Sequence, residues 1–434
     1  GVGDLWGRLS GAVRLEGSRG EGRDMTALIL ENSTLVDANA REARPGTSVL
    51  IEGERIREVS DRPIRMEGAR RIDLQGKTLM PGLIDAHCHV ILSDLNIQGV
   101  DAVPPTLVTA MAGKLMGEML DRGFTTIRDA AGADWGIQAA QQRGLIRGPR
   151  VWIAGRALSQ TGGHGDFRRR TQAHPEPCGC SSGAALTSRL ADGVSAVRHA
   201  AREELRQGAN QIKAMVSGGV ASPYDPIANI QYSEEELRAI VEEAAHWNTY
   251  VMAHAYTAEA ITHALRCGVR TIEHANLIDL ETARLAASLG AYIVPTLITY
   301  FAMGERGAEL GLPEASVLKL QNVLEFGLKS LEVCKEAGAK VGFGTDLLGP
   351  LHSEQRREFQ VRSEVLSAFE VLESATKTNA EILGMSGELG EVIPEALADL
   401  LVLEGNPLEN IHLLSEAPWQ MIIQNGVILR EQLN

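Results

Sequence analysis

The 434-residue chain lacks the features that mark membrane proteins and nucleic-acid-binding proteins. None of its apolar runs approaches the ~20 residues that a membrane-spanning helix needs. Asp and Glu outnumber Lys and Arg by 56 to 42, which gives a formal charge of −14. Nucleic acid requires a basic face, so this charge argues against such a partner. We therefore expect neither a membrane nor a nucleic acid among its partners.

Cysteine is also scarce. The five cysteines are scattered and odd in number, which does not fit a disulfide framework and favours a reducing compartment, expected to be the cytoplasm. Cys178 and Cys180 could bind a metal, but their spacing is poor for a zinc knuckle, and we interpret them as structural or incidental. Residues 1–24 are rich in Gly and Arg and lack the apolar segment of a signal peptide. We expect them to form a poorly ordered N-terminal extension.

Both ends of the chain beyond that extension are rich in short strands and poor in helices. Residues 27–79 contain short apolar runs separated by Gly, Asn, Asp and Pro, and a similar pattern returns at 399–429. Asn425-Gly426 between two apolar runs is a strong hairpin signal. We expect residues 25–80 and 388–434 to pair into one small β-sandwich.

The middle of the chain, residues 81–387, alternates short apolar strands with helical periods, which indicates βα units and a parallel sheet. The eight strand candidates are 83–90, 125–129, 150–155, 211–216, 250–255, 270–274, 291–296 and 340–346. Eight βα units form a TIM barrel, whose active site lies at the C-terminal ends of the strands. The sequence therefore predicts an α/β protein with a (β/α)8 TIM barrel and the sandwich as a second, small domain.

Residues that can ligate a metal occupy the ends of five of these strands. His87 and His89 follow the apolar run at the first strand, and residues two apart on a strand point to the same face. The other candidates are Lys213, His254, His274 and Asp346. A single strand histidine is more often a packing residue, a buried lysine can pair with a carboxylate, and an aspartate can cap a helix. These alternatives would require five strands to place such residues at one end by chance, so we favour a metal site.

The residue types indicate which metal. Imidazole and carboxylate favour zinc or a similar divalent ion, and a catalytic site keeps one position open for water. Lysine offers donors only and cannot bridge two cations. If Lys213 reacts with carbon dioxide, it becomes a carbamate, which is a bridging carboxylate. We infer this modification from the position of Lys213 alone.

Together, the segment 81–89, these ligand candidates and the split strand-rich ends make the chain resemble a binuclear-metal member of the amidohydrolase superfamily over roughly residues 25–434. The resemblance implies that His87, His89 and Asp346 hold one metal and that His254 and His274 hold the other. It also implies that a hydroxide and the carbamylated form of the lysine on the fourth strand bridge two divalent ions.

Longer segments refine this resemblance. Residues 155–166, 217–223, 254–257 and 344–349 are similar to those of the imidazolonepropionase-related dipeptidases, especially those acting on Xaa-Pro substrates. One departure is the segment 394–399, which lacks the usual glycine after its proline. This departure concerns a turn away from the site.

The resemblance also implies a mechanism, in which the bridging hydroxide attacks the amide carbonyl. Asp346 would take the proton and pass it to the leaving amine. His164 would donate to the developing oxyanion, unless it is a structural loop histidine. Tyr256 would bond the free carboxylate of the substrate, unless it only packs beside the metals. We expect the segment containing Thr296 and Tyr300 to wall a small apolar pocket that suits proline.

Some polar residues receive a plainer interpretation. The third-strand loop, 159–184, carries three consecutive arginines at 168–170 and His174, which suit a solvated face; a lid that attracts carboxylates is the alternative. Four further histidines are expected to be surface or packing residues, and these are His199, His246, His263 and His352.

Four functions are consistent with this pattern. The first is a metal-dependent dipeptidase of the prolidase type. The second is a broader amidase or carboxypeptidase for N-acyl amino acids, including aromatic amides such as ochratoxin-like toxins. The third is a cyclic-amide hydrolase or deaminase, which Lys213 disfavours because such deaminases commonly use one metal. The fourth is a non-catalytic metal-binding barrel. We also expect a homo-oligomer, by analogy with similar barrels.

Overall fold

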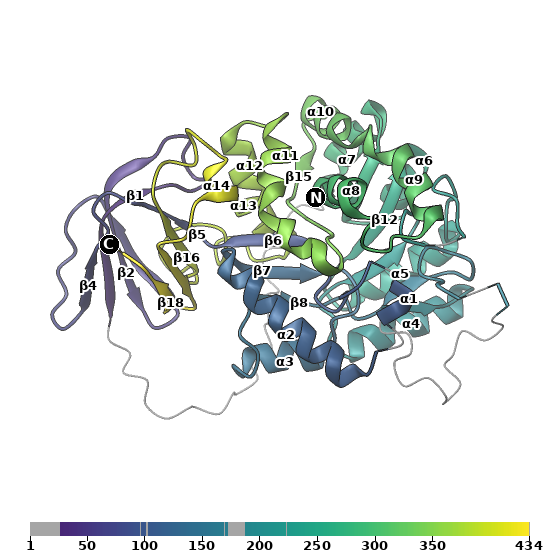
Figure 1. Ribbon diagram of the computed structural model, residues 1–434, viewed down its shortest axis with the longest axis horizontal. Coiled ribbons are helices and arrows are strands. Elements are labelled where there is room, and N and C mark those ends of the chain that lie inside the picture. Colours follow the sequence, from purple (N-terminus) through teal and green to yellow (C-terminus); the bar gives the residue numbers. More distant parts are fainter. Residues whose placement is uncertain are drawn as a thin grey trace.

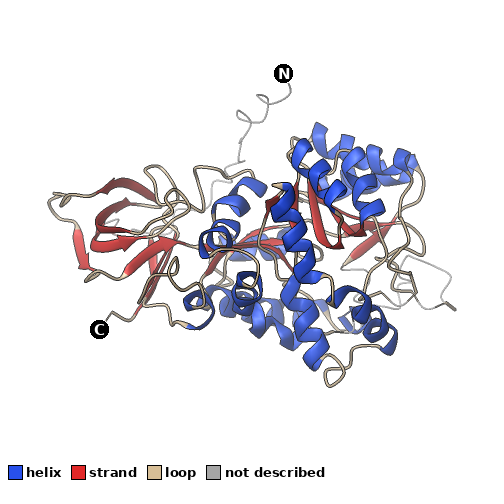
Figure 2. Ribbon diagram, turned by 90° about the horizontal axis from the view of Figure 1, so that it is seen from above, coloured by secondary structure: helices blue, strands red, loops and turns tan. Residues whose placement is uncertain are grey.

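The computed structural model describes residues 27–433 except 96, 101–102, 169, 172–186 and 223. The predicted extension at 1–24, His174, Cys178 and Cys180 lie outside the described residues. A strand-rich unit at one end of the molecule adjoins a larger body in which helices surround strands (Figure 1, Figure 2).

The strand-rich unit contains strands from both ends of the chain. Strand β5 pairs antiparallel with β16, so that Leu79 lies opposite Val402. All eight strands hydrogen-bond into one sheet, in the order β18-β17-β16-β5-β1-β2-β3 with β4 on β1. The strands are β1 (Leu28–Leu35), β2 (Arg44–Glu52), β3 (Arg55–Ser60), β4 (Arg70–Asp73), β5 (Thr78–Pro81), β16 (Leu400–Leu403), β17 (Met421–Gln424) and β18 (Val427–Glu431).

A break within β1 divides the sheet into two groups of strands, and the predicted sandwich stays a prediction. The first half of β1 pairs with β4 and the second half with β5, while its register with β2 shifts after Leu30. Asn32 lies at this break with a left-handed φ of +56°, a conformation that asparagine tolerates better than most residues. One strand thus connects both groups of neighbours by hydrogen bonds. The predicted domain boundaries stay a prediction.

All eight strand candidates of the middle region form parallel pairs. They correspond to β6 (Leu83–Cys88), β7 (Phe124–Asp129), β8 (Arg150–Trp152), β11 (Ile212–Met215), β12 (Val251–Thr257), β13 (Thr271–Leu277), β14 (Tyr292–Val294) and β15 (Lys340–Val341). Two further strands, β9 (Ala157–Ser159) and β10 (Ser188–Leu190), border the predicted loop 159–184 and were not among the strand candidates. Each has three residues.

Within the described residues, these strands do not form a closed ring. They form a three-stranded sheet, β6-β7-β8, and a seven-stranded sheet, β10-β9-β11-β12-β13-β14-β15. Gly155, with a φ of +65°, lies in the gap between β8 and β9. The other gap follows β15, where backbone bonds from Ala86 N to Phe343 O (2.9 Å) and from Asp346 N to His87 O (2.8 Å) replace a regular ladder. The structure confirms a mixed α/β fold with parallel sheets, but it does not show the closed sheet of the predicted barrel.

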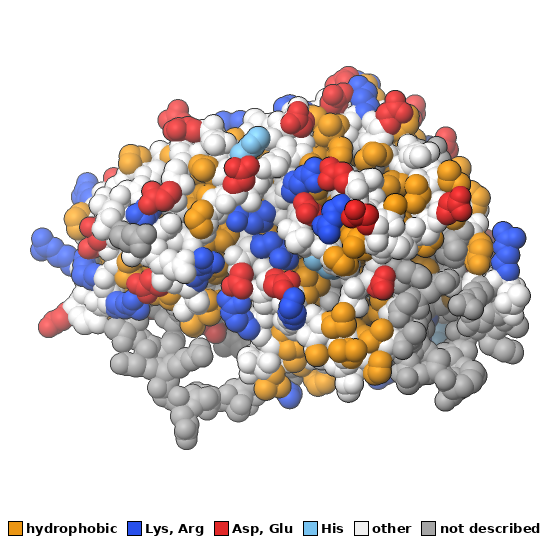
Figure 3. Space-filling view, viewed as in Figure 1, with side chains coloured by type: hydrophobic (Ala, Val, Ile, Leu, Met, Phe, Trp, Pro, Cys, Tyr) orange, Lys and Arg blue, Asp and Glu red, His pale blue; other side chains and the backbone are white. Residues whose placement is uncertain are grey.

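Helices follow most of the strands. They are α1 (Ile97–Val100), α2 (Pro105–Asp121), α3 (Trp135–Gln142), α4 (Val194–Arg206), α5 (Glu234–His246), α6 (Ala258–Arg266), α7 (Leu280–Leu289), α8 (Leu297–Arg306), α9 (Glu314–Leu324), α10 (Gly327–Ala337), η1 (Gly349–Arg357), α11 (Glu358–Ser363), α12 (Ala368–Ser374), α13 (Lys377–Ile382) and α14 (Leu413–Glu416). Ser233 forms a capping box with Glu236 at α5, and Asp279 caps α7 by accepting from Thr282 N. In the part of the chain that is described, no helix combines the length and apolarity needed to cross a bilayer. Acidic and basic side chains are interspersed on the face shown in Figure 3.

Asn379 of α13 ties β6 to the irregular segment after β15. Its buried side chain accepts from Phe343 N (3.0 Å) and donates to Ile84 O (2.6 Å) and Phe343 O (2.8 Å). We expect Asn379→Ala to destabilise the protein by about 2–3 kcal/mol, because it leaves buried backbone groups unpaired. The measurement is the urea midpoint of unfolding. The exposed Asn410→Ala is the control, and an equal shift in both variants would contradict the prediction.

Candidate active site

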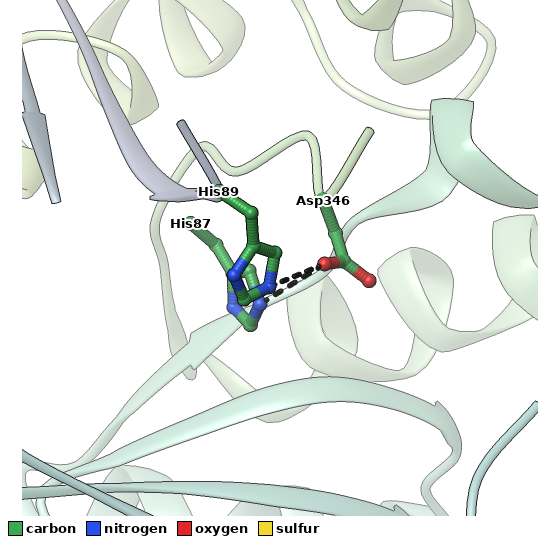
Figure 4. A group of neighbouring side chains, drawn as sticks. All are labelled: His87, His89 and Asp346. Atoms are coloured by element: carbon green, nitrogen blue, oxygen red, sulfur yellow. Dashed lines mark ion pairs between the residues drawn. The ribbon is translucent and has the colours of Figure 1, made fainter. Parts of the chain in front are cut away.

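His87, His89 and Asp346 converge where β6 ends (Figure 4). Asp346 Oδ1 lies 3.4 Å from His87 Nε2 and 3.0 Å from His89 Nε2. Among the described residues, only these three His, Cys, Asp or Glu side chains place their ligand atoms within 4.8 Å of one another. His87 Nε2 is buried and, apart from this contact with Asp346, has no hydrogen-bond partner. Buried polar nitrogens are normally paired, so this unpaired atom, together with two imidazoles and a carboxylate, fits a divalent metal.

Backbone geometry places Asp346 in this group. Its N–H donates to His87 O, and its φ of +50° is left-handed, as is the φ of +73° at His274. Such conformations in residues other than glycine are strained and occur most often at functional sites. Burial raises the pKa of Asp346, but the attraction of His87 and the hydrogen bond to His89 outweigh burial and hold the pKa well below its usual value. The aspartate is therefore ionised at neutral pH.

The Nδ1 atoms of three site histidines form hydrogen bonds on the side of the ring away from the site, which directs Nε2 toward the site. His87 Nδ1 bonds Glu273 Oε2 (2.6 Å), His89 Nδ1 bonds Ala131 O (3.0 Å), and His274 Nδ1 bonds Thr296 Oγ1 (2.8 Å). Such partners fix the tautomer and ring orientation of metal-binding histidines. Thr296 therefore contacts the Nδ1 side of His274, whereas we had expected it to form part of the pocket wall.

Glu273 and Arg128 form a buried pair that the sequence analysis missed. Arg128 Nη2 lies 2.9 and 3.1 Å from the two carboxylate oxygens of Glu273. Burial raises the pKa of Glu273, but Arg128 and His87 lower it to about 2. The sequence signal that could have revealed this pair is a charged residue inside each of two apolar strands, Glu273 in β13 and Arg128 in β7.

Lys213, His254 and His274 lie on three neighbouring strands beside this group. His254 Nε2 lies 3.0 Å from Gly218 O, so Nδ1 is its remaining nitrogen. Burial lowers the pKa of His254 and of His274 well below the usual value, which keeps both neutral, the form that ligates metals. Burial is also the largest cause that lowers the pKa of Lys213, to about 8. A much larger fraction of Lys213 is thus uncharged at neutral pH than of a solvated lysine.

These side chains line a cavity of about 60 Å³. Tyr256 and Tyr300 form part of its wall, and their hydroxyls lie 2.8 Å apart. The rest of the wall includes Leu92, Met215, Val220, Met303 and Leu348. The cavity thus combines apolar side chains with convergent histidine, lysine and aspartate groups, which is typical of a small-molecule site.

His164 also reaches this cavity. Its ring stacks on that of His254 with centroids 4.0 Å apart, and its Nδ1 lies 2.7 Å from Ser222 Oγ. His352, by contrast, is buried against Leu92 O (3.3 Å), and burial lowers its pKa to about 3. Arg168, in the predicted charge run, pairs with Asp166 at 2.6 Å.

Known proteins resemble the chain over almost all of its length. Residues 78–429 match the profile of the Amidohydrolase family. Ochratoxinase from Aspergillus niger is 31% identical over 425 residues, covering 90% of this chain and 87% of that protein. A solved prolidase complexed with N-methylphosphonate-L-proline has a TM-score of 0.91 and 50% identity, covering 94% of this chain and 100% of that one. A Xaa-Pro dipeptidase with bound methionine has a TM-score of 0.83 and 28% identity, covering 93% and 100%.

Proposed function

Because the chain belongs to the amidohydrolase family, we propose that it hydrolyses the amide bond next to a free C-terminal carboxylate, above all in Xaa-Pro dipeptides. The observation that carries this proposal is the small apolar cavity beside the group formed by His87, His89 and Asp346. A proline ring needs less room than an aromatic side chain. The 50% identity to a prolidase over 94% of the chain supports the same substrate class.

We propose that the site takes two divalent ions, in particular zinc. His87, His89 and Asp346 would hold one, and His254 and His274 the other, with carbamylated Lys213 between them. Bound metal ions would lower the pKa of water and polarise the substrate carbonyl. We also infer that the two parallel sheets belong to one (β/α)8 barrel that is interrupted at its two gaps.

The residues of this chain would then divide the remaining work. Asp346, ionised and close to His87 and His89, takes the proton of the attacking water and delivers it to the leaving nitrogen. His164, on the opposite wall beside His254, stabilises the negative charge that develops on the carbonyl oxygen. Tyr256 bonds the carboxylate of the substrate with the hydroxyl that contacts Tyr300 in this structure.

We expect Tyr256→Phe to raise KM for Xaa-Pro dipeptides about 10-fold or more, since a hydrogen bond to a charged group contributes about 1.5–3 kcal/mol. A Xaa-Pro amide lacks the carboxylate, so its already poor kcat/KM should change little. Steady-state kinetics on both substrates measure the difference. Tyr292→Phe, which removes a hydroxyl bonded to Glu381, is the matched control. Equal losses on both substrates would exclude the carboxylate contact.

A second candidate is hydrolysis of N-acyl aromatic amino acids. The 31% identity to ochratoxinase over 90% of the chain favours it. The same metal site and carboxylate contact would serve both substrates, and the difference would lie in the room available for the C-terminal side chain.

Zinc-reconstituted protein should therefore be assayed on Xaa-Pro dipeptides, other dipeptides, N-acyl-prolines and N-acyl-phenylalanines. Rates concentrated on C-terminal proline support the dipeptidase. Rates that favour N-acyl-phenylalanines would replace it with the amidase. No turnover by protein that holds two metals would exclude both and redirect attention to cyclic amides.

The compartment and assembly of the protein are also proposals. Cys88, Cys267 and Cys334 are buried free thiols, which is compatible with a reducing compartment such as the cytoplasm. Light scattering after size exclusion would test the expected homo-oligomer.

A further inference from the structure

A loop after β11 encloses the ring of His164. On one side the ring stacks against His254, with an interplanar angle of 20°. On the other it lies against the backbone of Gly219, where a Cβ atom would come within 2.2–2.6 Å of three ring atoms. Gly219 thus allows the loop to approach the imidazole closely. The ring can rotate little, and the partner of its Nδ1 determines which edge faces the cavity.

A hydrogen-bond chain supplies that partner. His164 Nδ1 lies 2.7 Å from Ser222 Oγ, and Ser222 Oγ forms a very short hydrogen bond with Asp225 Oδ1. An ionised carboxylate can only accept, so the single proton of the Ser222 hydroxyl goes to Asp225. The competing acceptor, Gly219 O, is farther away, at 3.3 Å. Ser222 Oγ must then accept from Nδ1–H of His164, which leaves Nε2 for the substrate. Nε2 donates to an oxyanion when it carries a proton as well, so the form of His164 that serves the oxyanion is the doubly protonated imidazolium.

Asp225 is itself held in place. It is 3% exposed, accepts from Gln231 Nε2 at 3.1 Å, and lies 3.7 Å from Lys319 Nζ. Lys319 of α9 also donates to Gly219 O (2.9 Å) and Ser222 O (2.8 Å). Burial raises the pKa of Asp225, but His164, Ser222 and Lys319 outweigh it and keep the carboxyl ionised.

We propose that Asp225 is a positioning residue that acts on the reaction through Ser222 and His164, and that Lys319 fastens the loop carrying this chain of bonds. The proposal rests on the proposed hydrolysis, because His164 is taken to face the substrate carbonyl. It adds a physical link across the site, since α9 follows α8, which carries Tyr300 of the opposite wall. The Asp225–Ser222 bond and the α9 anchor therefore set the orientation of the His164 imidazole.

The kinetic test compares wild type with Ser222→Ala and Asp225→Asn, each loaded with metal. Ser222→Ala removes one hydroxyl and leaves Asp225 paired with Lys319 and Gln231, so we expect this variant to fold. It therefore still tests the proposal if Asp225→Asn proves unstable. We expect kcat to fall about 10- to 100-fold in each variant, as small displacements of a catalytic group do, with KM changed less than about threefold. Asp121→Asn, in an exposed ion pair with Arg147, is the control and should leave both constants unchanged.

The same substitutions are then made in a His164→Ala background. If Asp225 acts through His164, they should change kcat there by less than about twofold, because the group they position is gone. An equal loss in both backgrounds would overturn the proposal and indicate a general structural role.

A second measurement needs no substrate. In protein labelled with ¹⁵N-histidine, the signal of a protonated Nδ1 that disappears in His164→Ala belongs to His164. We expect this signal in wild type and its shift or loss in Ser222→Ala. An unprotonated Nδ1 in wild type would overturn the proposal even if Xaa-Pro substrates are hydrolysed. The expected signal with no turnover on any amide would instead overturn the proposed function and leave the positioning of His164 intact.

Discussion

Asp346→Asn is expected to lower kcat on the best substrate by about 10³- to 10⁴-fold, the upper part of the range for losing a general acid–base group. An asparagine amide cannot take a proton from water at neutral pH. It also removes the negative charge that lies 3.0–3.4 Å from His89 and His87. The measurements are kcat by steady-state kinetics and metal content by mass spectrometry of the metal-loaded protein.

The matched control makes the same chemical change away from the site. Asp279→Asn retains the cap of α7, since Asn caps helices as well as Asp, and it should keep wild-type kcat. If Asp346→Asn retains full activity with its metal bound, the assigned base is wrong. If wild type and variant are equally inactive on every amide, the protein is better described as a metal-binding barrel without catalysis.

Lys213→Met is expected to lower kcat by at least about 10³-fold, equivalent to some 4 kcal/mol, and to reduce bound metal from two ions per chain to one or none. Methionine fills similar space but cannot form a carbamate. With a pKa of about 8, roughly a quarter of Lys213 is uncharged at pH 7.5, against about a thousandth for a solvated lysine. The uncharged amine is the form that adds carbon dioxide, giving a carbamate and a proton.

Two observations separate this prediction from a general effect of losing a lysine. Lys340→Met, which removes a surface lysine paired with Glu381, should keep both metals and full activity. A carbamate carbon signal should appear in wild type supplied with ¹³C-bicarbonate and be absent in Lys213→Met. Two tightly bound metals in Lys213→Met would show that no bridge from this lysine is needed.

Local periodicity accounts for what could be read from the sequence. The i, i+2 spacing of His87 and His89 requires only that β6 is a strand, because side chains two apart share a face. The eight middle strands and the caps at Ser233 and Asp279 were likewise predictable, since a run of apolar residues or a capping side chain acts within a few neighbours. The strands β9 and β10, which border the loop 159–184, were not predicted.

Closure of the barrel could not be derived from the same patterns. Counting eight strands gives the number of units but not the hydrogen bonds between the first and the last. At the end of β15, glycines and the left-handed Asp346 replace a ladder with a few single bonds to β6. Asn379, far along the chain, bridges this gap with its side chain.

Residue type and short-range spacing were sufficient for the positions of the eight middle strands, the family resemblance and the residues that can hold metal. The hydrogen-bond partners of these histidines became known from the three-dimensional structure alone. Glu273 bonds His87, Thr296 bonds His274, and the Ser222–Asp225 pair bonds His164. Such partners lie 22 to 186 residues away from the histidines they hold. Their distances are fixed by how the strands and loops pack, and no local pattern in the chain encodes that packing.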